Sequence, residues 1–410
     1  MKTYLVGGAV RDQLLEFPFH ERDWVVVGAT PEQMLEAGYQ QVGKDFPVFL
    51  HPLTKEEYAL ARTERKQGTG YTGFAVHADP SVTLEEDLLR RDLTINAMAL
   101  AEDGAIIDPY GGQCDLAARR LRHVSPAFVE DPLRVLRVAR FAARYAHLGF
   151  TVAPETIALM ADIVAAGELQ TLSSERIWRE TERGLTSASP EVFFDVLREC
   201  GAQTVLLPEL DALFGVPQSP SSHPEIDCGL HSMMVLQQAA ELSHDSAVRY
   251  AALVHDLGKA QTPAEDLPRH PGHEARTLPL LEAVQQRLKV PNRHAQLAHL
   301  VAKWHTTLHG LAQQTADNIL AMLTELGVFR QGGMLLEFTL CCEADSRGRL
   351  GFEHQDYPQA AQIIELAERC SQISAGSLLA SGIEGKAIGE ALRNQRLAQI
   401  ESFLKGLAAG

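Results

Sequence analysis

The sequence lacks any apolar run of membrane-spanning length, which excludes a transmembrane protein. Its N-terminus has one early lysine, a short apolar run broken by glycines and no small-residue cleavage site, so we expect no signal peptide. The six cysteines are scattered without Cys-x-x-Cys spacing. This pattern excludes a disulfide scaffold and predicts reduced, structural thiols in a cytoplasmic protein.

Basic residues are fewer than acidic ones: the chain has 37 Lys and Arg and 53 Asp and Glu, which gives a formal net charge of −16. Such acidity argues at first against a polyanionic partner. Between Arg119 and Arg144, however, seven arginines are opposed by only two acidic residues, and this local excess of positive charge can face phosphate. Histidine is uneven as well, since 10 of the 16 lie between His223 and His309. We infer two different chemistries in two regions.

Glycine and proline, at 31 and 20 of 410 residues, are not enriched. This composition excludes collagen-like and disordered chains and leaves a globular protein of roughly two to four domains. Short β-branched runs bounded by turn residues predict strands in the first 110 residues, and from about residue 113 onward apolar residues recur at helical spacing. The expected strands cover residues 4–6, 24–27, 48–50, 58–60 and 106–107.

The fold is therefore expected to be α+β, with a small mixed head and a mostly helical remainder. A segment rich in Pro and Ser, residues 214–224, predicts a linker between the arginine-rich and the histidine-rich parts. The expected domains cover residues 1–112, 113–222, 223–330 and 331–410.

A first group of residues near the N-terminus suits triphosphate and metal binding. Gly7 and Gly8 precede a helix start, where free backbone N–H groups bind phosphate, and Arg11 lies within reach. Glu21 and Asp23 stand on an extended segment with their carboxylates on one face, where they can chelate Mg²⁺. Taken alone, the glycine pair fits a tight turn and the acidic pair a solvated strand edge. Their combination favours a triphosphate–metal site.

Two further motifs combine arginines with acidic residues. Residues 90–97, RRDLTINA, carry groups that suit ribose and phosphate binding. Asp131, Arg134 and Arg137 recur at three-residue steps, which predicts one helical face. A carboxylate acceptor and a guanidinium donor on that face can hydrogen-bond the edge of a base as a complementary base would. An ion-paired surface helix is the alternative interpretation.

The set GGAVRD, ERD, RRDLTINA and EDPLRVLRVARF resembles the bacterial class II tRNA nucleotidyltransferases. This family belongs to the polymerase-β-type superfamily, together with the CCA-adding enzymes and poly(A) polymerases, and the motifs occur here in the family's order over residues 1–145. The resemblance implies a small polymerase-β-type nucleotidyltransferase head followed by a helical neck and body. It also implies addition or repair of the 3′-terminal CCA of tRNA from CTP and ATP, without a nucleic-acid template.

The resemblance carries over to individual residues of the head. Gly8 and Arg11 would contact the incoming nucleotide, and Glu21 and Asp23 would hold Mg²⁺. The family usually has Asp-x-Asp at this place, so Glu21 departs from the pattern, although glutamate is still an oxygen ligand and only one methylene longer. Glu64 is a candidate for a third carboxylate.

The resemblance also implies roles for the later arginines. Asp131 and Arg134 would present the protein-side template that selects C and then A, and the other nucleotide-binding residues would be Arg91, Arg137 and Arg140. The arginine-rich helices would contact the backbone of the acceptor and TΨC region of tRNA. We expect no membrane partner, and a monomer or a homodimer.

A second group of residues lies in the histidine-rich part. His255 and Asp256 follow an apolar stretch, and they form an ordered series with His231, His273 and His305. Neutral imidazole and carboxylate together are a ligand set for divalent transition metals. A single histidine is more often a core or surface residue, but the series favours a metal site.

This series resembles the HD superfamily of metal-dependent phosphohydrolases, which the multifunctional subgroup of CCA-adding enzymes in gamma-proteobacteria carries after its transferase part. The resemblance implies an all-α HD domain that hydrolyses phosphate monoesters and 2′,3′-cyclic phosphodiesters, with Ni²⁺ as a candidate metal. Close relatives often have His-Asp at the later position, where this chain has His305 and Thr306. Asp345 could supply a carboxylate instead.

Two alternatives remain open from the sequence. A poly(A) polymerase of the same superfamily would add many A residues and no C. A catalytically decayed RNA-binding protein or nucleotide sensor would bind nucleotide without turnover, with Glu21 and Thr306 as signs of decay.

Overall fold

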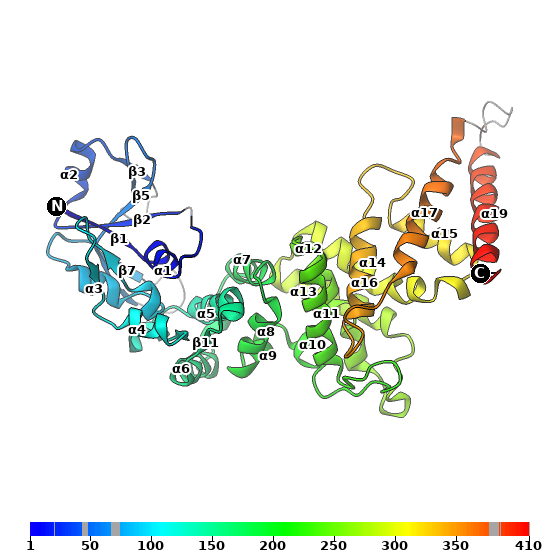
Figure 1. Ribbon diagram of the computed structural model, residues 1–410, viewed down its shortest axis with the longest axis horizontal. Helices are drawn as coiled ribbons and strands as arrows, with labels where there is room; N and C mark the ends of the chain where they lie inside the picture. The colour runs from blue at the N-terminus through cyan, green and yellow to red at the C-terminus, as the bar shows by residue number, and fades with distance from the viewer. Residues whose placement is uncertain (20, 43–47, 67–73, 377–384, 386, 410) are drawn as a thin grey trace. The chain divides into compact units, whose positions relative to one another are not determined.

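In the computed structural model, the chain forms two compact units, Met1–Leu206 and Leu207–Gly410 (Figure 1). The structure describes all residues except 20, 43–47, 67–73, 377–384, 386 and 410. Among the described residues, no helix combines the length and apolar character that crossing a membrane requires.

The first unit begins with a seven-stranded mixed sheet in the order β3-β4-β5-β2-β1-β8-β9. In its centre, β1 (Lys2–Val6) runs antiparallel to β2 (Asp23–Val27), and β2 runs parallel to β5 (Glu57–Leu60). The flanking strands are β3 (Gln40–Val42), β4 (Val48–Leu50), β8 (Ala99–Leu100) and β9 (Ile106–Ile107). The five strands expected from the β-branched runs are thereby confirmed.

Helices cover both faces of this sheet because successive residues of β2 point to opposite sides. Val25 packs with residues of α3 (Leu84–Leu89), whereas Val26 packs with Met34 of α2 (Pro31–Glu36). The strand β1 leads through a glycine turn into α1 (Gly8–Leu14). The loops that leave the strands therefore bring the acidic and glycine-rich motifs to this sheet.

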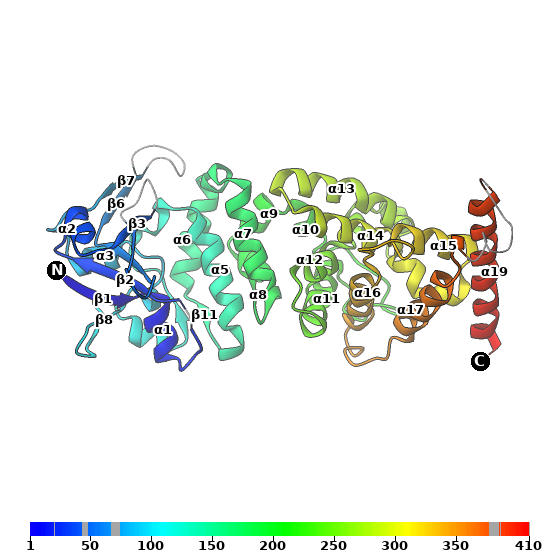
Figure 2. The same ribbon diagram turned by 90° about the horizontal axis from the view of Figure 1, so that it is seen from above.

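The remainder of the first unit is mostly helical. The helices α5, α7 and α8 pack against one another, as Figure 2 shows. Their cores are formed by apolar side chains such as Val135, Leu136 and Phe193, which are fully buried. The helices are α4 (Gly112–Ala117), α5 (Leu133–Tyr145), α6 (Pro154–Ala165), α7 (Ser174–Leu185), α8 (Pro190–Glu199) and α9 (Ala202–Leu206). The short strand pairs are β6 (Thr63–Lys66) with β7 (Phe74–His77), and β10 (Arg120–Leu121) with β11 (Thr151–Val152).

The second unit is helical. At the centre of this unit, the helix α16 packs against α11, α12 and α14. Its helices are α10 (Pro208–Asp211), α11 (Cys228–Leu242), α12 (Ser246–Val254), α13 (His273–Leu288), α14 (Asn292–His309), α15 (Ala316–Glu325), α16 (Leu335–Arg347), α17 (Pro358–Ser371) and α19 (Ala387–Ala409).

The Pro- and Ser-rich segment expected to be a linker lies inside the second unit. Pro217 forms an isolated bridge with Asp227, and the buried Gln218 donates its backbone N–H to the carbonyl of Ile226 at 2.6 Å. The expected boundary after residue 222 therefore falls within this unit, and the two compact units meet in sequence at Leu206 and Leu207. The polar side chains of the segment have partners here, which composition alone does not reveal.

Candidate functional sites

The turn between β1 and α1 brings the glycine pair against an arginine of the later motif. Gly7 has φ 70°, a conformation that favours glycine, and a Cβ there would lie 2.8 Å from Nη1 of Arg91. A side chain at Gly7 would thus strain the backbone and displace this guanidinium. The close approach explains why the sequence needs glycine between the strand and the helix.

The two predicted Mg²⁺ ligands lie at the start of β2. Glu21 and Asp23 are both exposed. Partial burial of its carboxyl raises the pKa of Asp23, the nearby Arg91 lowers it, and the charge of Glu21 raises it again. A carboxylate whose ionisation is disfavoured by a neighbouring carboxylate fits a divalent cation, which relieves that repulsion. The side chain of Glu64 lies outside the described part of the chain.

Arg11 is buried, although the resemblance implied a contact with nucleotide. It is only 3% exposed, and its Nε donates to Asp12 at 2.8 Å while Nη1 donates to Asn96. Its guanidinium also lies over the rings of Phe141 and Tyr145. In this arrangement Arg11 ties α1 to the RRDLTINA motif and to α5.

The helix α5 differs in one detail from the expected single helical face. Asp131 precedes the helix with an extended backbone, and its Oδ1 accepts a hydrogen bond from the N–H of Leu133 at 3.1 Å. Arg134 is largely buried and donates to the carbonyls of Arg90 and Ala127. The carboxylate and the guanidinium therefore flank the N-terminus of α5.

Two arginines of α5 are held by buried carboxylates. Arg137 donates from Nε to Asp92 at 2.8 Å, and Arg140 donates from Nε to Glu180 at 2.6 Å. Burial raises the pKa of Asp92, but Arg137 and Asn96 outweigh it and hold the pKa well below its usual range. The structure therefore connects α5 with the RRDLTINA motif and with α7.

Sequence reasoning missed two partners on α7. Glu180 holds Arg140, and Nη2 of Arg176 lies 3.5 Å from both oxygens of Asp131. Both residues belong to the charge-rich stretch SERIWRETER, which signals a polar helix face but names no partner. These pairs span 40 and 45 residues of sequence, so spacing could not have identified them.

In the second unit, the five predicted histidine and aspartate side chains meet in one buried cluster. They come from four elements that pack together, and Asp345 of α16 joins them. The sources are α11 for His231, the end of α12 for His255 and Asp256, the start of α13 for His273, and α14 for His305.

The cluster has two sides that share Asp256. On one side, Oδ2 of Asp256 lies 3.1 Å from Nε2 of His255, and Oδ1 of Asp345 lies 3.0 Å from Nε2 of His231. On the other side, Oδ1 of Asp256 lies 3.1 Å from Nε2 of His273 and 3.5 Å from Nε2 of His305. The two oxygens of one carboxylate thus face two different sets of ligand atoms.

All four imidazoles are oriented in the same way. Nδ1 of each ring donates to a main-chain carbonyl at 2.7–3.0 Å, and Nε2 faces the cluster. The acceptors are Gly348 for His231, Ala252 for His255, His270 for His273 and Val301 for His305. This arrangement directs each Nε2 into the cluster, where it can bind a metal once the ring is neutral, as in metal-bound histidines generally.

The cluster fits a divalent metal by a second observation. Nε2 of His255 and both carboxylate oxygens of Asp256 are buried and make no hydrogen bond of good geometry, although His255, Lys259 and His273 lie within ion-pair distance of that carboxylate. Burial raises the pKa of Asp256 and of Asp345, but the surrounding cations together outweigh it and hold both pKa values well below the usual range. These are His255, Lys259 and His273 for Asp256, and His255, His309 and His231 for Asp345. Buried polar atoms that make no hydrogen bond require another partner, and imidazole with carboxylate suits a transition metal.

Several residues around the cluster were not assigned from the sequence. Lys259 places Nζ 2.6 Å from Oδ2 of Asp256. His309 lies one helical turn after His305, donates from Nε2 to Asp345 at 2.7 Å, and pairs through Nδ1 with the hydroxyl of Tyr357. The repeated histidine spacing on α14 is the signal that could have identified His309.

Thr306 stands where close relatives often have aspartate. Its side chain contacts the carboxylate of Glu274. Its hydroxyl donates to Oε1 of Glu274 at 2.8 Å. The carboxylate of Asp345 occupies the cluster as the alternative ligand considered from the sequence.

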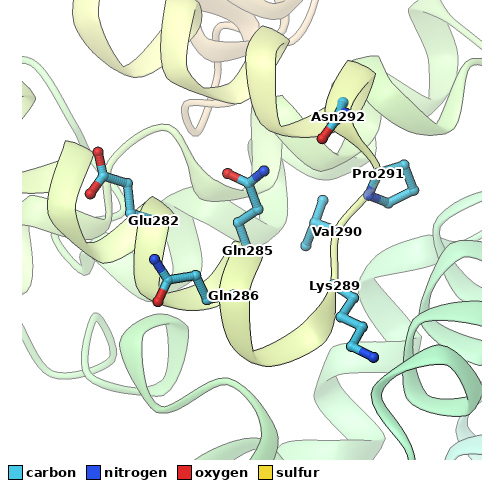
Figure 3. Close-up of a pocket in the computed structure, with 7 residues that line it drawn as sticks. All are labelled: Glu282, Gln285, Gln286, Lys289, Val290, Pro291 and Asn292. Carbon is cyan, nitrogen blue, oxygen red and sulfur yellow. The ribbon is translucent and has the colours of Figure 1, made fainter.

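A hollow of about 570 Å³ opens at the turn between α13 and α14 (Figure 3). It is lined by Glu282, Gln285, Gln286, Lys289, Val290, Pro291 and Asn292. None of the predicted site residues is among them, so this hollow is separate from the histidine cluster.

Comparisons with known proteins match three family models along the chain. Family models match the poly A polymerase head domain at residues 3–122, a "Probable RNA and SrmB- binding site of polymerase A" at 149–214, and the HD domain at 229–371. The HD match runs across the expected boundary after residue 330.

Curated relatives match along nearly the full length. The Multifunctional CCA protein of Thioalkalivibrio sulfidiphilus is 60% identical over 98% of both chains, and that of Pseudomonas aeruginosa is 56% identical over 98% of both. Among solved structures, an apo CCA-adding enzyme matches with a TM-score of 0.67 at 20% identity, covering 100% of this chain and 91% of that one. A Thermotoga maritima CCA-adding enzyme complexed with tRNA matches at 0.63 and 20%, covering 100% and 91%.

Proposed function

The chain belongs to the multifunctional CCA protein family, a CCA-adding tRNA nucleotidyltransferase joined to an HD domain, and from this premise we propose which residues perform each reaction. In CCA addition, the 3′-hydroxyl of tRNA attacks the α-phosphate of CTP or ATP, and pyrophosphate leaves. The first unit carries this reaction, and the second unit carries a metal-dependent phosphohydrolase.

The observation that carries the transferase assignment is the convergence of separate motifs on the start of β2. The glycine turn contacts Arg91, and the charge of Arg91 acts on Asp23. Arg91 and the turn bind the triphosphate, while Glu21 and Asp23 hold Mg²⁺. When bound there, Mg²⁺ would neutralise phosphate charge and favour attack by the hydroxyl.

Base selection belongs to the residues at the N-terminus of α5. Cytosine and adenine both carry an exocyclic amino donor beside a ring acceptor, and Asp131 and Arg134 supply the complementary acceptor and donor. Arg137 and Arg140, held by buried carboxylates, keep positive charge at the nucleotide. Gly8 and Arg11 support this site from α1, with Arg11 acting through Asn96.

The transferase is tested with a tRNA transcript that lacks its terminal CCA, analysed on a gel of single-nucleotide resolution. Growth by two nucleotides with CTP and by three with CTP and ATP is expected. Asp23→Asn should lower the rate by roughly 100-fold or more, because a metal ligand contributes several kcal/mol to the transition state. A long A tract would identify a poly(A) polymerase, and binding without extension would identify a sensor.

For the second unit, the observation that carries the proposal is the convergence of buried imidazole nitrogens and carboxylate oxygens, among which Nε2 of His255 and both oxygens of Asp256 make no hydrogen bond of good geometry. We assign His231, His255, Asp256, His273, His305 and Asp345 as metal ligands. A divalent metal bound there would polarise the phosphate and lower the pKa of an attacking water. The excess of imidazole over carboxylate favours a transition metal, and we propose Ni²⁺.

The phosphohydrolase is tested by stripping the full-length protein of metal and assaying 2′,3′-cyclic AMP and p-nitrophenyl phosphate. Ni²⁺ should restore hydrolysis in the wild type but not in His255→Ala, whereas Mg²⁺ alone should restore only CCA addition. Equal hydrolysis by His255→Ala would contradict the assigned site.

We also propose a cytoplasmic location, because the cysteines are unpaired thiols and tRNA is processed there. Binding of tRNA should weaken steeply as salt is raised, since phosphate contacts dominate its affinity. A monomer or a homodimer is proposed, and light scattering of the purified chain distinguishes the two.

A further inference from the structure

The segment 217–226, which we call the strap, closes on itself beside the histidine cluster. The bridge between Pro217 and Asp227 closes its base. Gln218 is 2% exposed, an unusual burial for a side chain in a stretch rich in Pro and Ser. His270 donates to the carbonyl of Pro217 at 3.1 Å and so joins the strap to the loop before α13.

Glu225 of the strap contacts His231, one of the proposed metal ligands, at the ring nitrogen that faces away from the cluster. Oε1 of Glu225 lies 3.1 Å from Nδ1 of His231, on the side of the ring opposite to the cluster. The same oxygen accepts a hydrogen bond from Nε2 of Gln218 at 3.2 Å, and Oε2 accepts one from the N–H of Leu350. Three donors therefore fix the carboxylate of Glu225.

A second strap residue contacts the buried lysine. Oε1 of Gln218 accepts a hydrogen bond from Nζ of Lys259 at 3.0 Å, and the same Nζ lies 2.6 Å from Asp256. The amide of Gln218 thus bridges Lys259 and Glu225, and a continuous polar chain runs from one cluster residue to another through the strap.

We propose that the strap is a positioning element of the phosphohydrolase site, in which Glu225 orients His231 and Gln218 orients Lys259. Nδ1 of His231 donates to the carbonyl of Gly348 at 3.0 Å, and the Glu225 carboxylate adds a second, charged acceptor at this nitrogen. A carboxylate there keeps Nδ1 protonated, directs Nε2 toward the metal and makes the ring a stronger ligand. The amide oxygen of Gln218 accepts from Lys259 and its amide nitrogen donates to Glu225, so the two contacts depend on each other. This inference rests on the proposed metal site.

The test is a Co²⁺ titration of the full-length protein, followed by visible absorption, which reports both affinity and ligand geometry. Glu225→Ala should weaken Co²⁺ binding by about 10–100-fold and change the spectrum, as removal of such partners does in other metal sites. Glu225→Gln, which keeps an acceptor oxygen, should give an intermediate loss. Gln218→Ala should weaken binding less and lower kcat for hydrolysis more than it changes KM.

The matched control is Glu353→Ala, which removes one half-buried carboxylate from the same unit, where it accepts a hydrogen bond from the backbone N–H of Gly351 in its own loop. It should bind Co²⁺ like the wild type. If the wild type itself bound no Co²⁺, the proposed metal site would fail. If the wild type bound Co²⁺ and both Glu225 variants gave its affinity and spectrum, only the positioning role would be overturned. Should Glu225→Ala not fold, Glu225→Gln alone decides between these outcomes.

Discussion

Arg137 of α5 donates from Nε to the carboxylate of Asp92 at 2.8 Å, and this pair joins the helix that we propose to select the base to the RRDLTINA motif. Asp92 also accepts from Nδ2 of Asn96, whose own oxygen accepts from Arg11. Three consecutive polar contacts therefore connect α5 with Arg11 of α1.

Asp92→Asn should destabilise the first unit, because it replaces a buried charged acceptor by a neutral one. Since Arg137 keeps a third of its side chain in water, we expect a loss of about 1.5–3 kcal/mol, the range for a hydrogen bond to a charged group. Urea-dependent hydrogen exchange of residues 133–145 measures it. Asp103→Asn, an exposed acid that caps only its own loop, is the control and should leave exchange unchanged.

The same pair should make stability depend on pH. The pKa of Asp92 is raised by burial and more strongly lowered by Arg137 and Asn96, so it lies below the unfolded value near 3.9. A lowered pKa contributes stability that is present above the unfolded value and lost as pH falls below about 4. The difference between wild type and Asp92→Asn should shrink from pH 7 to pH 3. A constant difference would contradict this linkage.

Removal of the template carboxylate should relax base selection. In Asp131→Ala the amino group of C or A loses its acceptor, so the ratio of kcat/KM for CTP over UTP should fall by at least about tenfold. Single-turnover extension of a truncated tRNA measures that ratio. Asp162→Ala, which removes an exposed acid from α6, should preserve it.

Metal loading should release protons from the histidine cluster. Burial lowers the pKa of His255, but Asp256 and Asp345 outweigh it and raise the pKa to about 10, so the metal-free ring is charged at neutral pH. A metal binds only the neutral ring and therefore displaces the proton. Calorimetric titrations in buffers of different ionisation enthalpy should show this release at pH 7.5 and its decline toward pH 10. Heats that do not depend on the buffer would refute the assignment.

Close relatives often carry aspartate directly after the histidine that is His305 here. Restoring that aspartate should not raise the thermal stability of the second unit. Thr306→Asp would place a carboxylate beside Glu274, where the threonine now donates a hydrogen bond. We expect a loss of about 1 kcal/mol in thermal unfolding of the second unit. Thr306→Asn should be tolerated, and adding Glu274→Gln to Thr306→Asp should recover the loss if the two carboxylates repel each other.

Much of the fold and of both sites follows from local sequence patterns. Glu21 and Asp23 are two residues apart, just before and at the start of β2, and His255 and Asp256 are adjacent, so their proximity needs no knowledge of tertiary packing. Strands were found where β-branched residues cluster, since these side chains suit a pleated, half-buried surface. The assigned roles of these residues are still predictions that the experiments above test.

The contacts that complete the sites could not be predicted, because they join distant parts of the chain. Asp345 meets His231 across 114 residues, and the sequence offered it only as one possible carboxylate. Gln218 lies in a stretch whose composition favours a linker, and Glu225 follows that stretch directly, although the two side chains contact each other. Arg11 was expected at the nucleotide, but the aromatic rings that cover it come from α5.

The acceptors that orient the four imidazoles are the main-chain carbonyls of Gly348, Ala252, His270 and Val301. A point mutation changes a side chain but leaves the carbonyl in place. Over evolutionary time, neighbouring side chains can therefore drift while the ring tautomers persist. Main-chain acceptors of this kind are insensitive to mutation wherever the backbone path is kept, whereas a side-chain partner such as Glu225 can be removed by a single substitution.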